Sequence, residues 1–225
     1  MHLLYIVRPG NNNEELRYSL RSLQNLPSVT SVTVVGDHPS WMVPDQFVKG
    51  NPSKSPVRSN GPANIRLAVD SPRVPDEFFL MNDDFYITAP VAAIEPMHRG
   101  SLHQHWQRRV TKTTLYAQTL LHTKELLKEH GVATSFSYEV HVPMLMTKER
   151  LAQVFEEFGL DPKPKWIRQY RSLYGNYHAV GGEEIVDPKE GPGMNTPYHS
   201  GSDSTFDKIE RNLHQRFPQP SRFER

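Results

Sequence analysis

Residues 77–84 read EFFLMNDD, an apolar run of strand length that leads directly into two consecutive acids. Such a run predicts a buried β-strand, so Asp83 and Asp84 stand where that strand ends. Because neighbouring residues on a strand point to opposite faces, we expect one acid to bind a ligand directly and the other to support it. A turn or a helix cap is the plainer use of the same pair.

Two other apolar runs predict partners for this strand. Residues 3–7 read LLYIV, and residues 31–35 read SVTVV. Between them we expect a helix, capped by Asn11 or Asn12 with a glutamate three positions later. Strand, helix and strand in this order indicate a parallel sheet and an α/β fold. The proline- and serine-rich stretch 39–62 is expected to form a loop across the carboxyl edge of that sheet.

The composition is that of an ordinary soluble globular protein. The 225 residues carry a formal net charge of +1, with 23% charged and 36% hydrophobic residues. The chain has no cysteine, which excludes a disulfide framework, a thiolate nucleophile and thiolate-bound zinc. It also lacks a membrane-length apolar run, and its first residues are expected to be a strand rather than a leader. These features favour one domain over 1–225 in a reducing cytoplasm.

A second candidate group lies at 138–142, which read YEVHV. Apolar and polar residues alternate there, so a half-buried strand is expected, with Glu139 and His141 on its polar face. A neutral imidazole can complete a metal site or accept a proton from a hydroxyl, although a strand histidine often has only a structural role. With Asp83 and Asp84, His141 therefore predicts a site for Mg²⁺ or Mn²⁺, because oxygen and imidazole are the ligands left to this chain.

Arginines supply the expected contacts to phosphate. Arg168 and Arg171 occur three residues apart, and a guanidinium group forms paired hydrogen bonds with phosphate oxygens. Arg17 and Arg21 lie four apart on the first predicted helix. They either line the same site or pair with nearby acids such as Glu14.

A basic stretch at 98–112 contains histidines, arginines and a tryptophan. Within it, Arg108 and Arg109 are candidates for contact with an anionic acceptor such as nucleic acid. An exposed loop with no ligand is the alternative.

Several segments together resemble the Stealth family of sugar-phosphate transferases. That family includes capsular polysaccharide phosphotransferases and the lysosomal-enzyme N-acetylglucosamine phosphotransferase. The resemblance begins with NEELRYSLRSL at 13–23, continues through VTVVGDHPSW at 32–41 and reaches FLMNDDF at 79–85. Residues 138–144 are similar to the histidine-proline block of the family, and residues 171–177 to its arginine block.

The resemblance implies a GT-A-like, Rossmann-like fold that binds a nucleotide-diphosphate sugar. It places the donor and metal half at about 1–95 and the acceptor and catalytic half at about 96–225. It implies Asp84 and Asp83 on the metal, His141 as a catalytic or metal-binding residue, and Arg171 on phosphate. The remaining donor contacts are expected from Arg17, Arg21, Asp37, Asn64, Arg66, Asn82 and Arg168. The acceptor contacts are expected from Arg108, Arg109, Tyr174 and Asn176.

Two reactions share this apparatus. Attack at the anomeric carbon transfers a sugar, and attack at phosphorus transfers a sugar phosphate. Family resemblance favours the second; the small size and the departure of residues 4–10 from the family, which has an aspartate near its first strand, favour the first. The acceptor is expected to be a glycan, or DNA with a hydroxylated base. A non-catalytic module that binds nucleic acid or glycan is the alternative from another class.

Overall fold

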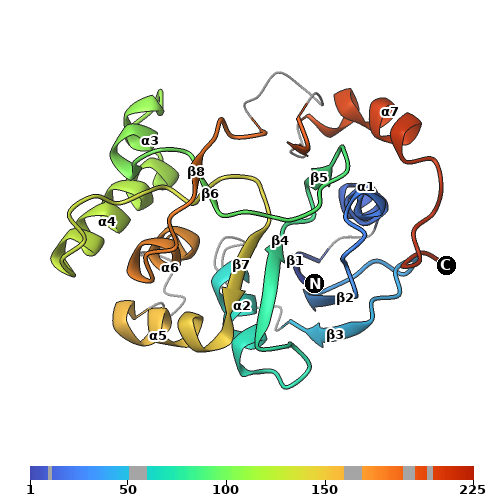
Figure 1. The fold of residues 1–225 in the computed structure, drawn as a ribbon, viewed down its shortest axis with the longest axis horizontal. Helices are drawn as coiled ribbons and strands as arrows, with labels where there is room; N and C mark the ends of the chain where they lie inside the picture. The colour runs from blue at the N-terminus through green and yellow to red at the C-terminus, as the bar shows by residue number, and fades with distance from the viewer. Residues whose placement is uncertain (10–11, 51–59, 160–168, 190–195, 202–204) are drawn as a thin grey trace.

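The computed structural model describes residues 1–9, 12–50, 60–159, 169–189, 196–201 and 205–225. Within these ranges one five-stranded sheet has the order β3-β2-β1-β4-β7 (Figure 1). The first four strands are parallel, and β7 is antiparallel to β4. The mostly parallel α/β architecture expected from the sequence is therefore confirmed. The strands are β1 (His2–Val7), β2 (Ser31–Gly36), β3 (Gln46–Lys49), β4 (Glu77–Met81) and β7 (Met144–Thr147).

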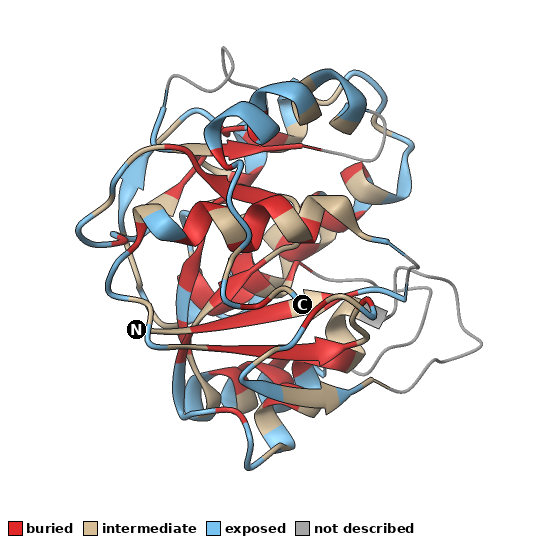
Figure 2. Ribbon diagram, turned by 90° about the vertical axis from the view of Figure 1, so that its right-hand side faces the viewer, coloured by how far each residue is buried: buried red, intermediate tan, exposed pale blue. Residues whose placement is uncertain are grey.

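Helices cover both faces of the sheet because alternate residues of its strands are apolar on both sides. In β1, Leu3 and Tyr5 join a core cluster with residues of α1 (Glu14–Ser22). Leu4 belongs to a second cluster with residues of α2 (Asn60–Asp70) and α5 (Lys148–Phe158). Figure 2 shows the buried residues concentrated along the central strands and on the helix faces turned toward them.

The remaining elements extend the two helical layers. On the α5 side lie α3 (Leu102–Arg108), α4 (Leu115–Glu129) and α6 (Tyr170–Tyr177), whereas α7 (Phe206–Arg216) packs beside α1 (Figure 1). The short 3-10 helix η1 (Leu23–Asn25) follows α1. Two small ladders complete the described fold. They pair β5 (Phe85–Ile87) with β9 (Tyr198–Ser200), and β6 (Met97–His98) with β8 (Glu183–Glu184).

The strand order changes direction between β1 and β4. The chain adds β2 and β3 on one side of β1 and then returns to place β4 on the other side. Loops that leave two such parallel strands in opposite directions leave a crevice between their carboxyl ends, where α/β proteins commonly bind ligands. Tyr5 is aligned with Met81, so the residues after Met81 lie at the carboxyl edge of the sheet where the strand order reverses.

Two local expectations need correction. The N-cap of α1 is Asn13 rather than Asn11 or Asn12, because the side chain of Asn13 accepts the hydrogen bond from the Leu16 amide. The stretch 39–62 is not all loop, since it contains β3 and the first residues of α2. The first strand, the second strand, β4 and α5 agree with the sequence patterns.

The expected strand at 138–142 is also wrong, although the burial pattern is right. Tyr138, Val140 and Val142 are buried while His141 is partly exposed. No strand is present there because the chain turns, with the Val142 amide donating to the Val140 carbonyl at 2.9 Å. The sheet strand begins later, at Met144. In the described part of the chain, none of the helices combines the length and apolar character needed to cross a bilayer.

Glu224 ties the end of the described chain to α1. Its carboxylate accepts from Arg21 Nη2 at 2.7 Å and from Arg17 Nη1 at 2.9 Å, and only 5% of its side chain is exposed. Burial alone would raise the pKa of Glu224, but the hydrogen bonds from Arg21, Ser221 and Arg17 lower it to about 2. The ionised carboxylate therefore stabilises the folded state.

We expect Glu224→Gln to lower the free energy of unfolding by about 1–3 kcal/mol at pH 7. Because the folded-state pKa lies below the ordinary 4.5, this contribution is complete above pH 4.5 and is lost as the pH falls toward 2. Urea denaturation at pH 7 and pH 3 measures the difference. Glu156→Gln, an exposed change on α5, serves as the control. A difference between Glu224→Gln and the native protein that grows on acidification would contradict this account.

Candidate active site

The acid pair forms the tip of a turn between β4 and β5. The Phe85 amide donates to the Asn82 carbonyl at 3.3 Å, which closes the turn around Asp83 and Asp84. The Gly201 amide then donates to the Asp84 carbonyl at 3.2 Å, which ties the turn to β9. The two carboxyl groups are thus presented at the carboxyl end of β4, as the sequence indicated.

The two acids have different partners. Asp83 Oδ2 accepts from Asn13 Nδ2 at 3.0 Å, and Asp84 Oδ2 binds Lys189 Nζ at 3.0 Å. Burial and the neighbouring Asp84 charge raise the pKa of Asp83. The other oxygen of Asp84, Oδ1, is buried and has no hydrogen-bond partner within the described residues. A buried carboxylate oxygen without a partner is costly, so this atom is suited to meet a ligand.

His141 stands beside this turn. Its ring lies edge-on to Phe85, the residue after Asp84, with ring centroids 5.7 Å apart. His141 Nδ1 lies 2.8 Å from Asp187 Oδ1, and the His141 backbone amide donates to the same oxygen at 3.2 Å. About a quarter of the His141 side chain is exposed, against 1% for Asp187. The imidazole therefore faces the surface while its partner is enclosed.

Arg99 supplies the charge opposite Asp187. Arg99 Nη1 donates to Asp187 Oδ2 at 2.6 Å, and both side chains are buried. Burial alone would raise the pKa of Asp187, but hydrogen bonding from His141 and the Arg99 charge lower it to about 2. Asp187 is consequently an ionised acceptor at neutral pH.

Arg171 supports the backbone around His141. Its Nη2 donates to the Val142 carbonyl at 2.6 Å, and its guanidinium lies 5.8 Å from the centre of the Phe85 ring. Burial lowers the pKa of Arg171, whereas the nearby Glu139 carboxylate acts in the opposite direction. Only 5% of the Arg171 residue is exposed, so its side chain approaches the site from the protein interior.

The structure adds two residues that the sequence patterns did not indicate. Asp187 and Lys189 come from one short segment, which contacts His141 through the first and Asp84 through the second. Each of these contacts joins residues far apart in the chain, and no motif surrounds Asp187. In the sequence this segment is a polar stretch with prolines, which indicates a loop but no functional site.

Three of the arginines expected at the donor lie elsewhere. Arg17 and Arg21 bind Glu224, as described above. Arg66 forms an exposed pair with Asp70 at 3.1 Å on α2. These three guanidinium groups are engaged by carboxylates outside the acid-pair turn.

Other expected donor residues lie nearer the carboxyl ends of the strands. Asn82 begins the acid-pair turn, and Asp37 follows β2, its amide donating to the last residue of β1. Asn64 is buried and packs closely against Gly36. A β-carbon added at position 36 would lie only 2.9 Å from Asn64 Nδ2. Arg168 lies outside the described residues.

The expected acceptor residues fall into two groups. Tyr174 is buried, and its hydroxyl accepts from the N-cap amide of α5 at 3.0 Å. Asn176 bonds both backbone groups of Phe136, each at 2.7 Å. These two side chains hold the fold together, whereas Arg108 and Arg109 lie at the end of α3.

The basic stretch does not form one exposed face. His98, Arg99 and His105 are buried, and burial together with the Arg99 charge lowers the pKa of His105 to about 3. Lys112 donates to three carbonyls at the end of α3. Arg108 remains exposed.

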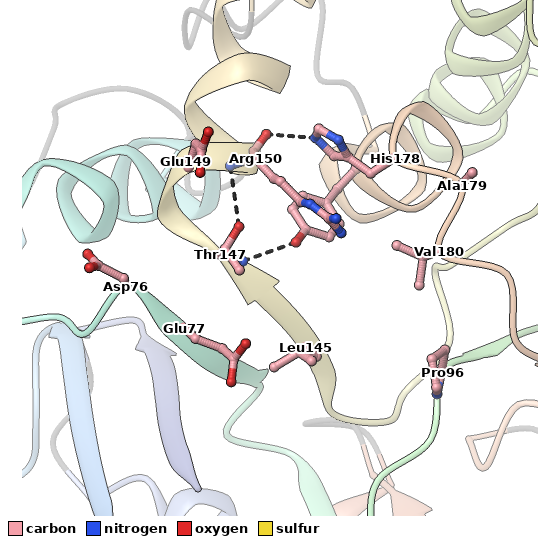
Figure 3. A pocket seen from close by; sticks show the side chains of 11 residues that line it. Asp76, Glu77, Pro96, Leu145, Thr147, Glu149, Arg150, His178, Ala179 and Val180 are labelled. Atoms are coloured by element: carbon pink, nitrogen blue, oxygen red, sulfur yellow. Dashed lines mark hydrogen bonds between the residues drawn. The ribbon is translucent and has the colours of Figure 1, made fainter.

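A cavity of about 800 Å³ lies at the opposite end of β4. Figure 3 shows Asp76, Glu77 and Leu145 on one side of it and His178 and Val180 on the other. It contains none of the residues of the acid-pair turn or of the His141 pair. We place the candidate site at the carboxyl edge instead, because the unpartnered buried oxygen and the histidine-carboxylate pair are there.

Among the residues that the structure describes, no group of three or more histidine, aspartate or glutamate side chains is arranged to hold a metal ion by itself. Searches against models of known protein families and against curated proteins found no match to this chain.

We expect Asn13→Ala to lower the free energy of unfolding by about 1–2 kcal/mol, because it removes the cap of α1 and the hydrogen bond to Asp83. Asn13 has φ +45°, so Asn13→Gly should lose less. Urea denaturation measures both, with Asn12→Ala, at an exposed neighbour, as the control. An Asn13→Ala protein as stable as the native one would show that the cap contributes nothing.

Proposed function

We propose that this chain is a transferase that moves a sugar from a nucleotide-diphosphate sugar to a hydroxyl group. One observation carries the proposal. The acid-pair turn and the partly exposed His141 lie at the carboxyl edge of a mostly parallel sheet. They are linked there by the packing of Phe85 against His141 and by the segment that carries both Asp187 and Lys189. Ligands of α/β sheets commonly bind at this edge.

The residues at the turn fit a divalent cation such as Mg²⁺ or Mn²⁺. Asp84 Oδ1 is buried and has no hydrogen-bond partner within the described residues, whereas Oδ2 is already paired with the Lys189 ammonium. Asp83 and Asp84 would hold the ion. Mg²⁺ usually takes one or two carboxylates together with substrate phosphates, so a cage of three protein side chains is not required. When bound, such an ion supplies positive charge against the diphosphate leaving group.

The chain's own residues have separate tasks in this proposal. His141 accepts the proton of the acceptor hydroxyl, because its ring is partly exposed and packs against Phe85, the residue after Asp84. Lys189, which binds Asp84, would place its positive charge against the anionic diphosphate of the donor. Arg171 holds the backbone that carries His141. The expected direct contact of Arg171 with phosphate is replaced, in this proposal, by a supporting role.

Sugar-1-phosphate transfer is the second candidate reaction. It is favoured by the segments at 13–23 and 79–85, which resemble the Stealth family. The sheet order also supports the GT-A-like expectation up to β4, because β3, β2, β1 and β4 follow the order of nucleotide-binding α/β folds. In both reactions a hydroxyl oxygen attacks the donor, at carbon in one case and at phosphorus in the other. A glycan hydroxyl or a hydroxylated DNA base is the acceptor class.

Incubation with a panel of nucleotide sugars and Mn²⁺ tests the proposal, with the released nucleotide identified by mass spectrometry. A nucleoside diphosphate indicates sugar transfer, and a nucleoside monophosphate indicates sugar-phosphate transfer. We expect Asp84→Asn to reduce kcat/KM by about 100-fold or more, through loss of charge at the leaving group.

Asp207→Asn, an exposed change on α7, is the matched control and should keep full activity. Binding of Mn²⁺, followed by electron paramagnetic resonance, gives a second measurement that does not depend on turnover, and Asp84→Asn should weaken it. If the native protein binds and consumes no nucleotide sugar, the transferase proposal fails.

A further inference from the structure

Asp187 is enclosed, and among the described residues its carboxylate meets three N–H donors and one imidazole nitrogen. Its carboxylate receives His141 Nδ1 at 2.8 Å, the His141 amide at 3.2 Å, the Lys189 amide at 3.2 Å and Arg99 Nη1 at 2.6 Å. Its side chain is 1% exposed. A buried carboxylate with this set of donors is held in one place.

The carboxylate determines which nitrogen of His141 carries the proton. An ionised carboxylate can only accept hydrogen bonds, so His141 Nδ1 must donate. Nε2 is then the nitrogen with a free electron pair in the neutral ring. Because the same carboxylate also binds the His141 backbone amide, both the main chain and the ring are fixed relative to Asp187.

Arg99 explains why Asp187 keeps its charge inside the protein. Its guanidinium compensates the carboxylate directly, with 5% of the Arg99 side chain exposed. When His141 gains a proton, the imidazolium faces an ionised carboxylate that is already in position. Asp187 itself cannot reach a hydroxyl acceptor at the surface, since it is enclosed.

We infer that Asp187 is a positioning residue that holds His141 with Nε2 ready to accept a proton from the acceptor hydroxyl, an inference that rests on the proposed function. In this step the hydroxyl proton passes to His141 Nε2 and the hydroxyl oxygen forms a bond to the donor sugar. The bond from the sugar to the diphosphate breaks, and its electron pair leaves with the diphosphate. For transfer of sugar phosphate, the new bond is to phosphorus, and the nucleoside monophosphate leaves.

A purely structural ion pair between Arg99 and Asp187 makes a different prediction. In that case the hydrogen bond to His141 is incidental, and loss of the carboxylate charge should act through stability alone. Two measurements separate these possibilities. One is which nitrogen of the His141 ring carries the proton, and the other is whether the effects of mutating Asp187 and His141 multiply.

The first measurement is the ¹⁵N chemical shifts of the histidine rings, with His141→Gln used to assign His141. We expect the native protein to carry the proton on Nδ1. In Asp187→Asn, whose side-chain amide can donate to the ring, the signal should move toward the other tautomer. A native His141 with its proton on Nε2 would overturn the inference, whether or not the variant folds.

The second measurement is turnover of the nucleotide-sugar donor. For Asp187→Asn we expect kcat to fall by about 100- to 10,000-fold, as when the histidine of a catalytic triad loses its carboxylate, and KM to change less than about threefold. In a His141→Gln background, adding Asp187→Asn should lower kcat by less than about a further threefold. The reason is that Asp187 acts only through His141, which that background already lacks. Asp207→Asn is the control.

Each outcome has a distinct meaning. A folded Asp187→Asn protein that keeps its kcat, or whose effect multiplies with that of His141→Gln, overturns the positioning role and leaves the transferase proposal standing. A native protein that turns over no donor overturns both, even if the tautomer is as expected.

Discussion

The central position of β1 is the constraint on which the rest of the structure depends. β1 pairs with β2 on one side and with β4 on the other, and its residues are buried on both faces. Charged residues are therefore absent from the interior of β1, β2 and β4 and appear where these strands begin or end. The acids after β4 consequently stand, partly buried, at the sheet edge where the strand order changes direction. The fold creates this location before any particular side chain gives it a chemical role.

Two ion pairs hold carboxylates of the candidate site. Asp84 faces Lys189 and Asp187 faces Arg99, so each of these two carboxylates has a cation supplied by the chain, whereas Asp83 is bound by the Asn13 amide. The two pairs differ in exposure. Arg99 and Asp187 are enclosed, which suits a fixed arrangement, whereas about a third of the Lys189 side chain is exposed to solvent.

Sequence patterns predicted what depends on near neighbours in the chain. The apolar runs of β1, β2 and β4 and the placement of the acid pair needed only local information. At His141 the alternation of burial was right, but a turn replaced the expected strand, because pairing with β4 begins only at Met144. Asp187 and Lys189 could not be predicted. Their partners lie 46 and 105 positions away, and such contacts leave no periodicity in the sequence.

The late position of β7 in the chain affects how the protein is made. Residues 2–81 contain all four parallel strands, but the strand that covers the outer edge of β4 is synthesised only at 144–147. A nascent chain that has passed β4 therefore exposes unpaired backbone groups along that edge while α3 and α4 are still being translated. Such an edge readily pairs with other chains. Slow elongation over this interval would favour aggregation of the nascent chain, and a chaperone that shields the edge would favour its folding.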